Sequence, residues 1–192
     1  MAGTSPEAGF SLIESLIAMA ISGLVLGAIF SFMIVQRQYL VVQEQVTAMV
    51  QGARAALDMV AADIAMAGYS PTGAAVVGVP YQGSALELRA DLNGNGVVTD
   101  PGETTRYTYD PEEQRLLRNS GDGDQPVAEP VQAFTVAYLD AAGNPTMVTA
   151  EVRQIRLTLT MRTAKPDPSY PTNGGHRAYT LTSVVTPRNL AP

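Results

Sequence analysis

The sequence predicts an α+β protein with a long N-terminal helix, half of it membrane-embedded and half amphipathic, packed on a C-terminal antiparallel β-sheet domain. Three observations lead to this fold class: an apolar segment near the start, a helical stripe of apolar residues after it, and alternating apolar residues in the second half. They divide the 192-residue chain into a leader (residues 1–9), a transmembrane segment (10–35), an amphipathic continuation (36–68) and a β-rich domain (69–192).

The apolar segment is long enough to cross a membrane. Between Phe10 and Val35 the only charged residue is Glu14. As a helix the segment rises by roughly 39 Å, which exceeds a hydrocarbon core of about 30 Å and allows some tilt. A secretory signal peptide is the alternative, but its apolar core is usually only ~7–15 residues long and a small-residue cleavage site follows it. Gly23 and Gly27 lie on one face, where they either permit close helix–helix approach or reflect ordinary membrane-helix composition.

The helical pattern continues beyond Arg37 as a single apolar stripe. Apolar residues recur there at spacings of three and four, and polar residues occupy the other faces. Gly68 and Pro71 mark the expected end of the helix. The members of the stripe are Tyr39, Val42, Val46, Met49, Ala53, Leu57, Val60, Ile64 and Ala67.

The second half of the chain has the two-residue period of β-strands. In the first strand, Leu86 and Leu88 alternate with Glu87 and Arg89. The tetrapeptide at 110–113, Asp-Pro-Glu-Glu, predicts a hairpin turn. Six strands are expected, at 85–90, 105–109, 114–118, 133–139, 152–161 and 179–185, with a proline-rich loop at 165–176.

Composition argues against several functions. The formal net charge is −6, from 12 basic and 18 acidic residues, and the basic residues do not cluster, so a nucleic-acid interface is not expected. The chain has no cysteine, which excludes disulfides, thiolate metal sites and thiol catalysis. With His176 as the only histidine and no Ser/His/Asp set, we expect no catalytic residues and no enzymatic activity.

The stretch Gly9-Phe10-Ser11-Leu12-Ile13-Glu14 resembles the prepilin processing site of type IV pilins and type II secretion pseudopilins. The resemblance extends to the long helix and the strand-rich half of the chain. It implies that prepilin peptidase, a membrane aspartyl peptidase, cuts between Gly9 and Phe10, and that Phe10 becomes the N-methylated first residue. The leader departs from the family pattern because Ala8 stands where many prepilins carry Lys or Arg, and no basic residue precedes Gly9.

Glu14 needs an explanation because a charged side chain at the centre of a membrane helix costs roughly 2.5–3.5 kcal/mol, and less near an end. The dipole at the helix N-terminus favours a carboxylate there. The resemblance implies a second role, in which Glu14 pairs with the amine of Phe10 on a neighbouring subunit. We favour this assembly role, because the dipole rarely justifies a carboxylate within a membrane segment.

Two further stretches, 54–71 and 183–190, resemble the helix end and the C-terminus of minor pilins of the PilW type. This resemblance implies a structural subunit that primes or caps a pilus filament serving adhesion, motility or DNA uptake. Its partners would be other pilins and the inner-membrane assembly platform. The precursor would cross the bacterial inner membrane once, in contact with lipid, with its C-terminal domain in the periplasm. Minor pseudopilin J of type II secretion is the rival, and a membrane-anchored binding module that does not polymerise is the third hypothesis.

The loop at residues 91–103 resembles the first half of an EF-hand-type calcium loop. Side-chain oxygens stand at relative positions 1, 3 and 5, glycine at 6, a backbone carbonyl at 7 and threonine at 9, while position 12 is Gly102 and carboxylates lie on either side of it. The alternative is an Asn–Gly-rich surface turn that binds no ion. Ca²⁺ is the only candidate cofactor that the sequence suggests. The candidate ligands are Asp91, Asn93, Asn95, Val97 (carbonyl), Thr99, Asp100 and Glu103.

Overall fold

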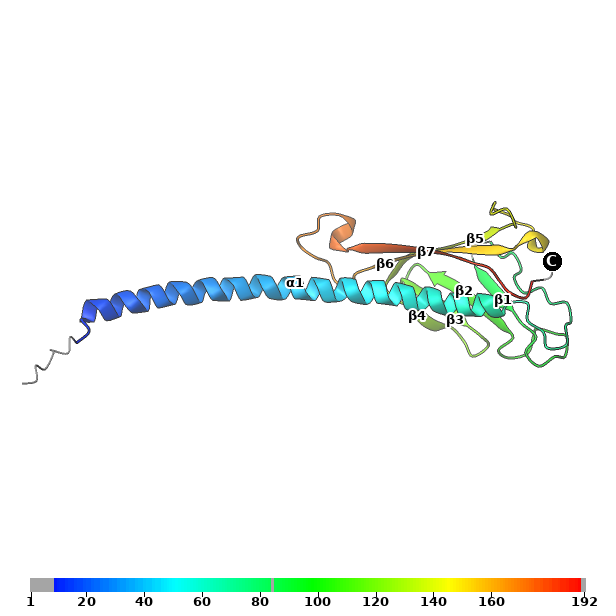
Figure 1. Ribbon diagram of the computed structural model, residues 1–192, viewed down its shortest axis with the longest axis horizontal. Coiled ribbons are helices and arrows are strands. Elements are labelled where there is room, and N and C mark those ends of the chain that lie inside the picture. Colours follow the sequence, from blue (N-terminus) through cyan, green and yellow to red (C-terminus); the bar gives the residue numbers. More distant parts are fainter. Residues whose placement is uncertain (1–8, 84, 191–192) are drawn as a thin grey trace, which may run out of the picture. The chain divides into compact units, whose positions relative to one another are not determined.

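The computed structural model describes residues 9–83 and 85–190. By internal contacts the chain divides into two compact units, an N-terminal unit (Met1–Glu44) and a C-terminal unit (Gln45–Pro192). In chain order the elements are α1 (Leu12–Met66), β1 (Leu86–Arg89), β2 (Thr104–Asp110), β3 (Arg115–Asn119), β4 (Gln125–Ala128), β5 (Val131–Leu139), the 3₁₀ helix η1 (Thr149–Glu151), β6 (Gln154–Arg162), η2 (Asn173–Gly175) and β7 (Ala178–Val185) (Figure 1).

The predicted long helix is confirmed, with each end within two residues of the expected position. Gly68 follows it with φ of 80°, the left-handed conformation that ends many helices and that glycine adopts without strain. The Gly68 N–H donates to the Arg89 carbonyl at 2.8 Å, and the Asp91 N–H donates to the Tyr69 carbonyl at 2.8 Å. The chain leaving α1 is therefore hydrogen-bonded to β1 and to the residue that opens the 91–103 loop.

The described part of the N-terminal unit consists of the first part of α1 and the three residues before it, and its side chains are almost all exposed. Among described residues 9–44, every side chain is exposed except that of Val42, which is half-buried. Leu24 and Phe30, for example, are 76% and 69% exposed. By length and composition this helix could cross a membrane, and none of the apolar window that meets this criterion is buried. Such a surface needs lipid or other helices around it.

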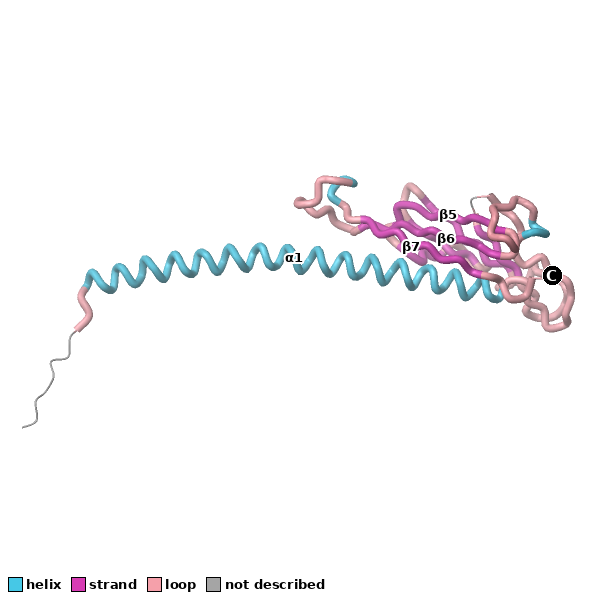
Figure 2. Tube along the Cα trace, turned by 45° about the horizontal axis from the view of Figure 1, so that its top comes forward, coloured by secondary structure: helices cyan, strands magenta, loops and turns pink. Residues whose placement is uncertain are grey.

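The C-terminal unit contains two antiparallel sheets, where we expected one. The first has the strand order β1-β2-β3-β4 and the second the order β5-β6-β7, and Figure 2 shows the second as three neighbouring strands. The six predicted strands are confirmed, but β4 was missed. It is only four residues long and contains Pro126, and proline removes a backbone donor and usually argues against a strand. Since β4 completes the first sheet and only two residues separate it from β5, the chain moves to a second sheet there.

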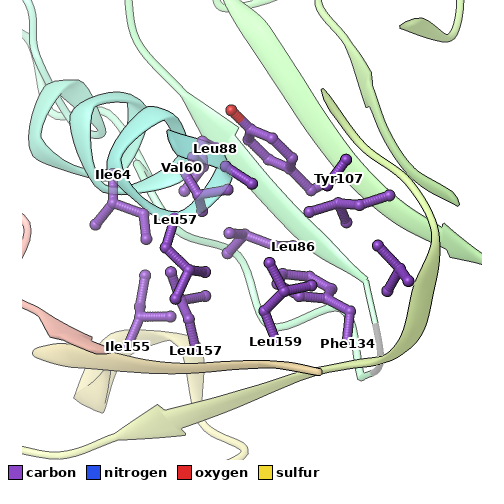
Figure 3. Close-up of a cluster of buried hydrophobic side chains, with 14 of the residues drawn as sticks. Leu57, Val60, Ile64, Leu86, Leu88, Tyr107, Phe134, Ile155, Leu157 and Leu159 are labelled. Atoms are coloured by element: carbon purple, nitrogen blue, oxygen red, sulfur yellow. The ribbon is translucent and has the colours of Figure 1, made fainter. Parts of the chain in front are cut away.

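The core of the C-terminal unit lies between α1 and both sheets. Figure 3 shows Leu57, Val60 and Ile64 of α1 facing side chains of β1 and β2 on one side and of β5 and β6 on the other. The apolar stripe is therefore confirmed from Met49 to Ala67, whereas Tyr39, which lies in the N-terminal unit, is 67% exposed. The largest fully buried side chains are Tyr107, Ile64, Leu86, Leu116, Leu139, Ile155, Leu157, Leu159, Val60, Val79, Val131 and Val152.

Two acidic residues expected on polar faces have buried or half-buried positions. Glu87 in β1 is 3% exposed, and its carboxylate accepts hydrogen bonds from Arg106 (2.6 Å) and Arg89 (2.8 Å). Burial alone would raise the pKa of Glu87, but the hydrogen bonds from the two guanidinium groups outweigh it and lower the pKa. The simple alternation expected for β1 fails because this carboxylate has cationic partners within its own sheet.

Asp63 of α1 is the second such residue. Its Oδ2 accepts hydrogen bonds from the Tyr107 hydroxyl at 2.6 Å and from Arg118 Nε at 2.8 Å. Burial, together with the adjacent Asp63 carboxylate, raises the pKa of Tyr107 well above its usual value. These bonds join α1 to β2 and β3.

Candidate assembly and calcium sites

Gly9 and Phe10 lie in exposed, non-helical chain just before α1. Phe10 is 85% exposed, and the helix begins two residues later, at Leu12. The Gly9–Phe10 bond is thus exposed and outside the helical hydrogen-bond ladder. Residues 1–8 of the leader lie outside the described residues, and cleavage stays a prediction.

Glu14 takes part in a reciprocal helix cap that the sequence analysis missed. The Ser11 N–H donates to Glu14 Oε2 at 3.2 Å, and the Glu14 N–H donates to Ser11 Oγ at 3.4 Å. This is a capping box, in which a serine before the helix and a glutamate three residues later satisfy each other's backbone donors. The sequence signal was Ser-x-x-Glu ahead of an apolar run. Because Glu14 remains exposed, it is accessible to a further partner while it caps its own helix.

Gly23 and Gly27 lie on α1 with open space around them. A Cβ atom built at either position would meet nothing within 4 Å. Packing within the described part of this chain therefore does not require glycine at either position. Their role in helix–helix approach stays a prediction.

In the 91–103 loop, Asp91 is fully buried and holds the loop at its first residue. Its Oδ1 accepts the Gly94 N–H at 2.7 Å, and its Oδ2 accepts the Ser70 hydroxyl at 3.0 Å and the Gly96 N–H at 3.1 Å. Burial alone would raise the pKa of Asp91, but these hydrogen bonds outweigh it and lower the pKa. Asp91 is therefore an ionised carboxylate at neutral pH.

The side chains of Asn93 and Asn95 converge on Asp100. Their Nδ2 atoms donate to Asp100 Oδ2 at 2.8 Å and 2.7 Å. Their Oδ1 atoms accept the N–H groups of Asn95 and Val97, each at 2.9 Å. Three of the predicted ligands are thus gathered at one point.

Glu103 is hydrogen-bonded to the backbone at the start of the loop. Its side chain is 3% exposed, and its Oε1 accepts the N–H groups of Leu92 (2.9 Å) and Asn93 (3.3 Å). Its second oxygen, Oε2, is buried and has no hydrogen-bond partner among the residues that the structure describes. Val97 and Thr99 are exposed. No group of three or more His, Cys, Asp or Glu side chains in the described residues is placed to hold a metal ion, so any ion here would also need amide and carbonyl oxygens.

Comparisons with known proteins bear on the N-terminal site. Residues 4–30 match the prokaryotic N-terminal methylation motif. Among solved structures, a type IV-like pilin from Thermus thermophilus is similar, with 18% identity and a TM-score of 0.47 over 76% of this chain and 100% of that chain. The curated proteins compared with the sequence include no match.

The matched motif covers Gly9, Phe10, Glu14 and the start of α1. The motif therefore falls on the residues expected to form the processing site. The apolar N-terminal helix fits membrane anchoring.

Proposed function

We propose that this chain is a minor type IV pilin of the PilW type, a structural subunit that primes or caps a pilus filament outside the cytoplasmic membrane. The observation that carries the proposal is the apolar surface of α1 between residues 12 and 35, which is exposed on all sides and begins inside the methylation motif at residues 4–30. Because this surface is unstable in water, it requires lipid in the precursor and neighbouring helices in the filament.

Glu14 provides the electrostatic contact between subunits. Cleavage after Gly9 frees an amine on Phe10, and the carboxylate of a neighbouring Glu14 neutralises it among apolar helices. A charge pair buried in this way is strongly destabilised when one partner is removed, commonly by about 3–5 kcal/mol, because the other charge stays buried and unpaired. The precursor crosses the inner membrane once, with its β domain in the periplasm, where the assembly platform and other pilins receive it.

Replacing Glu14 with glutamine separates assembly from capping. Glutamine also serves at this position of a capping box, so Glu14→Gln keeps the cap and removes the charge. We expect the variant to enter the membrane and to be lost from filaments, measured by immunoblotting sheared pili against membrane fractions. Ser11→Ala is the matched comparison: it weakens the cap by about 1 kcal/mol but keeps the carboxylate, so it should retain most of the incorporation that Glu14→Gln loses. Normal incorporation of Glu14→Gln would contradict the proposal.

The intact mass of the filament-associated protein tests processing. We expect a mass that lacks residues 1–9 and carries one additional methyl group. A membrane-anchored module that does not polymerise would keep those nine residues, so their retention in the working protein would reject the filament proposal.

A minor pseudopilin would share this N-terminal chemistry. Deleting the gene distinguishes the two readings: loss of surface pili supports the pilus, whereas loss of protein export with intact pili supports type II secretion.

A further inference from the structure

We propose that the free edge of β7 pairs with an uncharged extended segment of another protein, which adds a fourth, antiparallel strand to the sheet β5-β6-β7. β7 (Ala178–Val185) lies at the end of this sheet, and among the described strands it pairs with β6 alone. The inference goes beyond filament assembly, because it concerns backbone groups of the C-terminal unit.

One hydrogen bond just before β7 shows which of its backbone groups point away from β6. The Thr163 N–H donates to the Arg177 carbonyl at 2.8 Å, and the next pair along the ladder is Arg162 with Ala178. In an antiparallel ladder, hydrogen-bonded pairs alternate with pairs that are not hydrogen-bonded. The odd-numbered residues of β7 therefore exchange bonds with β6, whereas the even-numbered residues direct their N–H and carbonyl groups to the free edge. These even-numbered residues are Ala178, Thr180, Thr182 and Val184.

The backbone groups on this edge have no partner within residues 9–83 and 85–190. No hydrogen bond from the backbone or from a side chain of those residues reaches an N–H or carbonyl of the four even-numbered residues. All four residues are exposed, whereas the odd-numbered ones are half-buried. Donors and acceptors thus alternate along an open edge, and the partner whose groups match them in spacing is another extended backbone.

The other described sheet edges are at least partly covered or interrupted. In β1 the Arg89 N–H donates to the Gly78 carbonyl at 2.8 Å, and in β5 the Tyr138 carbonyl accepts the N–H of Thr146 at 2.9 Å. β4 is only four residues long and contains Pro126. Proteins protect edge strands by such cover, by proline or by charge. The sequence of β7, Ala-Tyr-Thr-Leu-Thr-Ser-Val-Val, has neither a proline nor a charged residue.

The side chains of β7 define the chemistry of the added strand. On the outer face the Thr180 hydroxyl is bonded to that of Thr160 at 2.9 Å. Thr182 is bonded in the same way to Thr158 at 3.2 Å, so these short side chains do not fold over the edge. The segment that fits carries small or β-branched residues on this face, apolar residues on the inner face and no charge, because β7 offers no charged partner. The apolar residues of β7 that pack against the core are Tyr179, Leu181 and Val185.

A second copy of this chain does not fit the edge when both copies are anchored in one membrane, as proposed above. The Lys165 N–H, near the start of β7, donates to Gln45 Oε1 at 2.9 Å, and Asn189, beyond its end, donates to the Ala65 carbonyl at 3.2 Å. β7 and residues 45–66 of α1 therefore run in the same direction (Figure 1). Antiparallel pairing of two copies would point their helices in opposite directions, whereas chains in one membrane have parallel helices. The occupant is therefore a segment of another protein.

Binding of a synthetic peptide to the full-length protein in detergent micelles tests the proposal. The probe alternates threonine with valine, has glutamine at both ends, and is N-methylated on its valines so that only one of its edges can pair. We expect saturable binding by fluorescence anisotropy and at least ~10-fold slower hydrogen exchange at the amides of Thr180 and Thr182. Moving the methyl groups to the threonines should weaken binding at least ~10-fold, because it removes the donors that face β7. Equal binding of the two peptides would overturn the proposal.

Variants of one edge residue localise the peptide. Thr182→Pro removes an N–H that points away from β6, so the β6–β7 ladder keeps its bonds, and peptide binding should weaken at least ~10-fold. Thr182→Val is the matched control, because it also loses the hydroxyl bond to Thr158 but keeps the N–H, and it should bind as the parent does. Should Thr182→Pro fail to fold, Thr180→Lys must show the weakened binding, because a charge on an edge strand opposes pairing.

Two further outcomes would reject the edge as a docking site for another protein. The first is a parent that binds neither peptide, or a folded Thr182→Pro or Thr180→Lys variant that binds like the parent. The second is slow exchange at the amides of Thr180 and Thr182 without peptide in a protein that is dimeric in the micelle, which would show that a second copy occupies the edge.

Discussion

The two parts of α1 obey the same helical geometry and differ in what surrounds them. Between residues 12 and 35 apolar side chains cover nearly the full circumference, and among residues 12–44 every side chain but that of Val42 is exposed. Between residues 45 and 66 they form one stripe, and that stripe is buried against two sheets. A stripe can be covered by the chain's own strands, whereas a fully apolar circumference cannot. One helix is thus divided into a part that folds with its own domain and a part that requires other molecules.

Paired isoleucine substitutions should show the largest difference between the two parts. Ile64 is 0% exposed and Ile21 is 56% exposed. Ile64→Ala should lower the free energy of unfolding of the β domain by about 2–5 kcal/mol, because it removes buried methyl groups and leaves a cavity. Ile21→Ala should change it by no more than about 0.5 kcal/mol. Urea unfolding of both variants in detergent measures this, and similar losses would show that residues 12–44 contribute to the domain's stability after all.

Glycine substitutions should give the next largest contrast. A Cβ atom at Gly78 would lie 2.2 Å from the Gly68 nitrogen and 2.6 Å from its Cα, so the helix exit would have to move. Gly78→Ala should lower the free energy of unfolding of the β domain by at least about 1–3 kcal/mol. A Cβ atom at Gly27 would meet nothing within 4 Å, so Gly27→Ala should leave the free energy of unfolding of the domain unchanged.

The same glycine pair also tests the membrane face. Gly27→Ala should reduce incorporation into filaments only if neighbouring helices approach at that face, which quantitative immunoblotting of sheared pili detects. A loss of domain stability in Gly27→Ala equal to that of Gly78→Ala would contradict the division of the helix.

Lowering the pH should destabilise the C-terminal unit, and this effect should be smaller than those of the isoleucine and glycine substitutions. Hydrogen bonds from Ser169 and Arg177 lower the pKa of Asp167 from 3.8 to about 2. A carboxylate whose folded pKa is depressed contributes stability above its unfolded pKa and loses it as the pH falls to the folded value. The domain should therefore lose stability between about pH 4 and pH 2, and the loss should be smaller in Asp167→Asn. Thermal unfolding across this range checks it, and identical pH profiles would contradict it.

The sequence predicted the elements whose signals are local. The helix and six strands follow from apolar periods read within a few residues. Calcium binding by the 91–103 loop, which rests on oxygen donors at fixed spacing, stays a prediction. The Ser11–Glu14 cap, which was missed, has an equally local signal: a serine three residues before a glutamate at the start of an apolar run.

The features missed from sequence depend on distant residues. Asp63 bonds to Tyr107 and Arg118, and Glu87 to Arg106, so their positions on polar faces gave no hint of these partners. The division into two sheets depends on strand pairing, which no single strand encodes. The unpartnered oxygen of Glu103 likewise appears only once the chain has folded around it.

The reciprocal bonds between Ser11 and Glu14 restrict the rotamers of the glutamate before any other subunit is present. Immobilising a long side chain during association typically costs about 0.5–1.5 kcal/mol of conformational entropy. In the proposed filament an arriving amine would meet a carboxylate that has already lost most of this freedom. The serine would thus preorganise the subunit contact without touching the neighbouring chain.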